Sequence, residues 1–113
     1  MIDRKLLNDH FLGDNDFIVT LIDQYFPAYD DYMGKIRADL ESRNFESLAF
    51  FAHKLKGLIV LFWDPVATEI AERFVRMAKD KSETGLENTF NELETKSIAL
   101  NEEIRLLKQE FTS

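Results

Sequence analysis

The sequence contains no cysteine, and only two prolines and four glycines interrupt its 113 residues. The lack of cysteine excludes disulfides, thiolate metal ligands and a cysteine nucleophile, and it is typical of proteins from a reducing compartment. The longest apolar run, Leu58 to Trp63, is far too short to span a bilayer. The stretch from Met1 to Lys5 lacks the apolar segment of a secretion signal. We therefore expect a cytoplasmic protein that does not act in a membrane.

Motifs of several enzyme classes are also absent. The chain has no glycine-rich phosphate-binding loop, so we expect no ATP binding and no kinase activity of its own. It has no G-x-S-x-G motif, which presents the serine nucleophile of many hydrolases. The Glu-x-x-His pairs of di-iron bundles are missing too, because Leu7 and Phe50 stand three residues before the two histidines. We expect neither a metal site nor a cofactor belonging to the chain itself.

The charge balance argues against one class of partner. The formal net charge is −7, and the lysines and arginines are scattered along the chain rather than gathered into a patch. Such a surface repels the phosphate backbone of nucleic acids. We therefore expect no binding to DNA or RNA.

The composition and the spacing of apolar residues predict a soluble helical domain. Hydrophobic residues make up 45% of the chain and charged residues 31%, which suits one globular domain spanning residues 1–113. Apolar residues recur every three to four positions throughout, and no segment has the alternation of a strand. The connections are short, which favours helices that run up and down. The predicted fold is all-α: an antiparallel up-down four-helix bundle with a short extra N-terminal helix.

Capping signals and apolar stripes predict where the helices lie. We expect an Asp or Asn N-cap in the turn after Gly13, an N-cap at Asn44, and another at Asp64 followed by proline. Pro27 should bend the long second helix or divide it into two. The expected helices cover roughly residues 2–7, 17–40, 45–62, 65–81 and 86–111. Their expected core stripes are Phe17, Leu21, Tyr25, Tyr29, Met33, Ile36 and Leu40; Leu48, Phe51 or Ala52, Leu55, Ile59 and Phe62; Val66, Ile70, Phe74 and Met77; and Leu86, Phe90, Leu93, Ser97, Leu100, Ile104, Leu107 and Phe111.

One group of residues on the third helix has the composition of a phosphate-transfer site. His53 lies about 100° around the helix from Ala52, at the edge of the core, where it can face solvent. A neutral imidazole is a competent nucleophile at physiological pH. Lys56 and Gly57 follow one turn later on the same side, and they offer positive charge for phosphoryl oxygens and open space. Because glycine costs about 1 kcal/mol relative to alanine inside a helix, Gly57 indicates that this space matters.

The segment Ala52 to Gly57, Ala-His-Lys-Leu-Lys-Gly, resembles the Ala-His-x-Leu-Lys-Gly motif of histidine phosphotransfer (HPt) domains of two-component phosphorelays. The resemblance continues through Phe26-Pro27, the capped turn before the histidine helix and the total length, so it covers nearly the whole chain. It implies that His53 is the phosphoacceptor and that Lys56 and Gly57 support it.

The resemblance also implies the partners. Proteins of this family carry phosphoryl groups between receiver-domain aspartates, so the expected partners are the receiver domains of a hybrid histidine kinase, of a response regulator, or of both. The family lacks kinase activity of its own, and the receiver supplies the Mg²⁺ ion. We expect a monomer, with the seam of the last helix closing the bundle internally.

The chain departs from the family pattern just after the motif. Family members usually have small residues after the glycine, whereas this chain has Leu58 and Ile59, and later Trp63 and Asp64. This bulk indicates an atypical docking surface, extra contact with the opening helix, or loss of transfer. A pure interaction module, which binds a receiver or kinase domain without accepting phosphate, is therefore the alternative function. His10 has no motif around it, and we expect a surface or turn residue there.

Overall fold

The computed structural model describes all 113 residues, and all of its regular elements are helices. The five α-helices are α1 (Arg4–His10), α2 (Asn15–Ser42), α3 (Phe45–Ile59), α4 (Pro65–Lys79) and α5 (Leu86–Thr112), and the 3-10 turn η1 (Val60–Phe62) extends α3. The prediction of an all-helical chain without strands is confirmed. None of these helices combines the length and the apolar character that crossing a bilayer requires.

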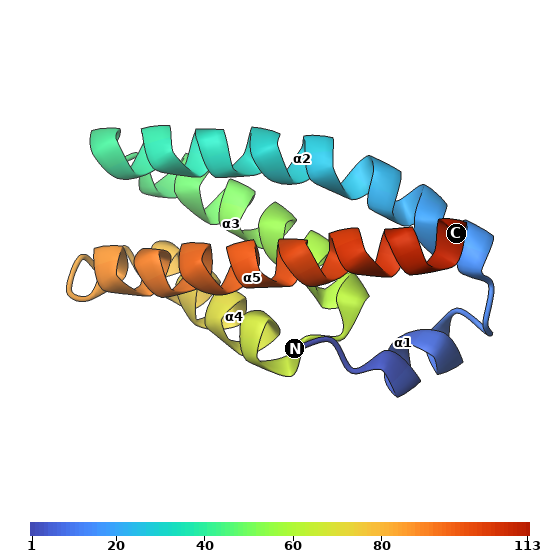
Figure 1. Cartoon of the computed structure of the whole chain (residues 1–113). Coiled ribbons are helices and arrows are strands. Elements are labelled where there is room, and N and C mark those ends of the chain that lie inside the picture. The colour runs from blue at the N-terminus through green and yellow to red at the C-terminus, as the bar shows by residue number, and fades with distance from the viewer.

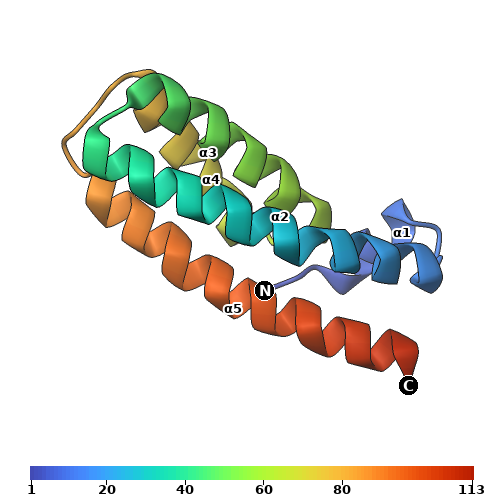
Figure 2. The same ribbon diagram turned by 90° about the horizontal axis from the view of Figure 1, so that it is seen from above.

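The four longer helices lie side by side, and α1 packs at one end of them (Figure 1). α2 contacts α3 and α5, and α4 contacts the same two helices. Successive long helices run in opposite directions, as the view from above also shows (Figure 2). The result is an elongated body of 44 × 22 × 19 Å with one apolar core along its length.

Side-chain caps set the helix starts. The carboxylate of Asp14 accepts a hydrogen bond from the Phe17 backbone N–H at 3.0 Å and so begins α2. The side chain of Asn44 caps α3 and that of Asp64 caps α4 in the same way. These caps satisfy N–H groups that have no partner inside the helix, and they are the caps that the sequence predicts.

α2 is one continuous helix rather than two, although Pro27 lies inside it. The proline removes a single backbone donor, and the buried residues on either side of it face the same core. Figure 1 shows α2 bending in its first half, which contains the proline. The expected kink is therefore accommodated without a break.

Two of the predicted core stripes are wrong at their first positions. In α2, Ile18 and Ile22 are buried, whereas Phe17 is 48% exposed and Leu21 is only half-buried. In α4, Val66 is exposed, and the neighbouring Ala67 is buried instead. Both errors come from counting in steps of four, because each such step turns about 40° past a full turn of a 3.6-residue helix. Met77 of α4 and Phe111 of α5 are only half-buried, and the other predicted core positions are buried, with Ala52 rather than Phe51 buried in α3.

Two buried hydrogen bonds join α2 to α5. The Tyr25 hydroxyl donates to Asn101 Oδ1 at 2.7 Å, and the Tyr29 hydroxyl lies 2.6 Å from Ser97 Oγ. Burial raises the pKa of both phenols, so both remain protonated at physiological pH. These pairs satisfy polar groups inside the core and fix the register of the two longest helices.

Candidate functional site

The outer side of α3 carries the residues that the sequence identifies as the site. The buried residues Leu48, Ala52, Leu55 and Ile59 turn one side of α3 toward α2 and α4. His53 follows Ala52 about 100° further around the helix, and its side chain is exposed to solvent. An imidazole in this position is open to a reactant held by another molecule.

The two supporting residues lie one turn further along α3. Lys56 is half-buried, and Gly57 is exposed. A Cβ atom added to Gly57 would meet no other atom within 4 Å. Close packing within the chain therefore does not explain this glycine, and the surface beside His53 is left open at Gly57.

Apolar side chains flank the histidine on the same side of α3. Phe50 lies one turn before His53 and is 55% exposed, and Val60 lies two turns after it and is 43% exposed. The ammonium group of Lys54 lies over the Phe50 ring, 5.3 Å from its centroid. Both apolar side chains are therefore accessible to a partner that approaches His53.

The segment of α3 around His53 carries positive charge. Between Phe50 and Val60 the only charged residues are Lys54 and Lys56, whereas the formal net charge of the chain is −7. These two cations are the ones that the helix itself offers to an anionic reactant at His53.

The bulky residues after the motif contact the opening segment of the chain. Trp63 ends η1 in the left-handed conformation, with φ of 54°. Its carbonyl accepts a hydrogen bond from the Asp3 N–H at 2.7 Å, and its indole lies 5.5 Å from the His10 ring, centroid to centroid. Of the three interpretations of the bulk after Gly57, extra contact with the opening helix is thus observed. His10 itself is exposed at the end of α1, as expected.

Asp64 has a larger structural role than the sequence indicates. Its side chain is fully buried, with 0% exposure. It accepts hydrogen bonds from the Ala67 N–H at 3.0 Å and from the amino group of Met1 at 2.9 Å, and Lys96 Nζ lies 3.6 Å away. Burial alone would raise the pKa of this carboxyl, but these donors and charges outweigh it and lower the pKa. The carboxylate joins the opening segment, α4 and α5.

No group of three or more His, Asp or Glu residues is placed to hold a metal ion. No buried side-chain polar atom lacks a hydrogen-bond partner.

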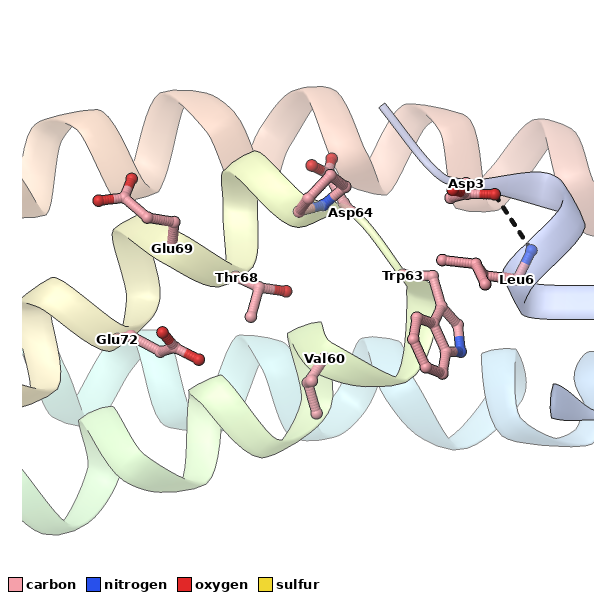
Figure 3. A pocket seen from close by; sticks show the side chains of 9 residues that line it. Asp3, Leu6, Val60, Trp63, Asp64, Thr68, Glu69 and Glu72 are labelled. Carbon is pink, nitrogen blue, oxygen red and sulfur yellow. Dashed lines mark hydrogen bonds between the residues drawn. The ribbon is translucent and has the colours of Figure 1, made fainter.

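Beside η1 the surface is hollowed into a cleft of about 400 Å³ (Figure 3). Side chains of α1, η1 and the first part of α4 line it, and Val60 of η1 also continues the His53 side of α3. The sequence gives no sign of this cleft, because its walls come from separate segments.

Comparison with known proteins adds no relative: no family model, no curated protein and no solved structure matches the chain.

Proposed function

We propose that the protein is a histidine phosphotransfer protein that carries a phosphoryl group on His53 between receiver-domain aspartates of a multistep phosphorelay. The observation that carries the proposal is an exposed imidazole on α3 with Lys56 and an open Gly57 one turn away. The motif resemblance supports the same assignment. The protein works in the cytoplasm as a monomer, and it is a carrier rather than an enzyme.

The proposal includes a specific interpretation of the fold. The four long helices form the antiparallel up-down bundle of this family, and α1 is the extra N-terminal helix. The neighbour relations of α2 to α5 and their alternating directions support this interpretation. His53 lies midway along α3 and is exposed to solvent, so that it is accessible to a partner from outside the bundle.

In the proposed reaction the partner holds an aspartyl phosphate and its own Mg²⁺ ion. A ring nitrogen of neutral His53 attacks the phosphorus, the new P–N bond forms, and the P–O bond to the aspartate breaks. The electron pair of that bond returns to the aspartate as carboxylate, and the proton on the other ring nitrogen stays in place. The reverse sequence delivers the phosphoryl group to the next receiver.

The chain contributes positioning and charge rather than further bond making. Phosphoryl transfer passes through a loose transition state whose charge spreads over the equatorial oxygens. Lys56 lies one turn from His53 and provides a cation for those oxygens. Gly57 leaves room for the partner and for the phosphorylated ring.

The proposal is tested with receiver domains phosphorylated with labelled acetyl phosphate. The parental protein is expected to gain an acid-labile, alkali-stable label, as phosphohistidine does. The His53→Gln protein should gain none while it still binds the receiver, because docking depends on the surrounding apolar surface. His10→Gln is the matched control and should be labelled normally. Label on the His53→Gln protein would place the phosphoacceptor elsewhere.

A second candidate function rests on the exposed apolar residues near His53. Phe50 and Val60 offer docking surface that needs no chemistry. In that case the protein binds and sequesters a receiver or kinase domain without accepting phosphate. Receiver binding without any label on the parental protein would favour this function over transfer.

A further inference from the structure

The cleft beside η1 combines an apolar lining with an acidic edge. Leu6 of α1, Val60 of η1, Trp63 and Pro65 supply apolar surface. Glu69 and Glu72 of α4 lie along the rim. This pairing differs from the basic, apolar surface immediately around His53.

The two glutamates are not equivalent. Glu69 forms an ion pair with Arg73 at 3.4 Å, and Figure 3 shows its carboxylate turned away from Val60. Glu72 forms no ion pair within the protein, although Arg76 follows four residues later. Its carboxylate points toward the Val60 side of the cleft (Figure 3). Glu72 is therefore a half-buried residue whose carboxylate has no cation of its own.

We propose that this cleft binds an arginine side chain from the protein that exchanges phosphate with His53. A guanidinium donates paired hydrogen bonds to a carboxylate, which Glu72 offers at one end of the cleft, and the Trp63 indole offers apolar surface at the other end (Figure 3). The apolar lining suits the aliphatic stem of the arginine and the apolar neighbours that flank it. A lysine is the poorer fit, because its ammonium is a compact and strongly hydrated charge.

The position of the cleft explains why the occupant belongs to the same partner. Val60 follows His53 by seven residues on the same side of the helix, which is about 10 Å along the axis. A single protein seated over His53 and Gly57 therefore extends over the cleft. The proposal rests on the proposed function for the identity of the partner, but the arginine preference can be tested without it.

The first test uses a short peptide as a probe. Trp63 is the only tryptophan, so its indole N–H gives one resolved signal in a ¹⁵N NMR spectrum. The probe is the blocked tripeptide Leu-Arg-Leu, and its control carries citrulline, which has the same shape without the charge. The arginine peptide should shift the indole signal in a saturable way and the citrulline peptide should not. Glu72→Gln should weaken arginine-peptide binding about fivefold, the upper range for an exposed ion pair.

The matched control is Glu41→Gln, which removes an exposed carboxylate from α2 and should leave peptide binding unchanged. Equal shifts from the two peptides, or no shift with either, would overturn the proposal. A shift produced equally well by methylguanidine alone would also overturn it, because the cleft would then take a small cation rather than a protein segment.

The second test uses the labelled receivers. Glu72→Gln should raise the receiver concentration needed for half-maximal labelling by about fivefold. This increase should be smaller in high salt, which screens the ion pair. An unaltered half-saturating concentration would show that the partner does not use the cleft. If the parental protein takes no label, the proposed function fails, whereas the peptide result still decides the arginine preference.

Discussion

Replacing Gly57 should change stability and transfer in opposite directions. The structure leaves space for a side chain, because an added Cβ meets no atom within 4 Å. Glycine in a helix is less stable than alanine by about 0.5–1 kcal/mol, since its backbone loses more freedom on folding. For a domain of 113 residues, a gain of about 1 kcal/mol corresponds to a rise in Tm of roughly 4 °C. Gly57→Ala should approach this rise.

Transfer should fall as the side chain at this position grows. Gly57→Leu places a branched side chain one turn from the phosphorylated ring, and we expect labelling by a phosphorylated receiver to slow at least about tenfold, or about 1.4 kcal/mol of barrier. Gly34→Ala in α2 is the matched control, because this helical glycine also has open space around it. It should raise Tm similarly and leave transfer unchanged. If Gly57→Leu transfers phosphate at the parental rate, the open space at residue 57 is not needed for transfer. If Gly57→Ala has a lower Tm than the parental protein, alanine does not stabilise α3 at this position.

Three further results are expected. Lys56→Ala should slow labelling roughly tenfold to a hundredfold without abolishing it, because a charge-assisted contact is worth about 1.5–3 kcal/mol when well formed; stopped-flow or quench-flow labelling measures this. The lowered pKa of Asp64 adds stability that is present above about pH 4, its unfolded value, and is lost as the pH falls through the folded pKa. Below pH 4, the free energy of unfolding measured in urea should therefore fall more steeply with decreasing pH for the parental protein than for Asp64→Asn. Parallel falls in the two proteins would contradict the assignment. Tyr25→Phe should lower the free energy of unfolding by about 1–3 kcal/mol, because it leaves the buried side-chain oxygen of Asn101 without its donor. Tyr29→Phe should cost less, since its serine partner also donates to a backbone carbonyl, and equal losses in urea unfolding would argue against this difference.

The sequence determined those features that depend on neighbours within about one turn. Asn44 and Asp64 begin helices because a side chain caps N–H groups two or three residues away. The outward position of His53, with Lys56 and Gly57 beside it, follows from the angle between residues of one helix. The chemical hypothesis for this site needs no tertiary contact for the same reason.

Tertiary structure decided what depends on residues far apart in the chain. In α2, Ile18 is buried and Phe17 is not, because the helices against which α2 packs decide which of its faces is covered. Periodicity alone places the buried position one residue too early. The buried carboxylate of Asp64 is paired with Lys96 from a different helix, and the Tyr25 hydroxyl donates its hydrogen bond to Asn101 of α5. The cleft at Trp63 likewise exists only where α1, η1 and α4 meet. Local spacing fixes which side chains share a face, whereas burial and partner choice depend on which faces the folded chain brings together.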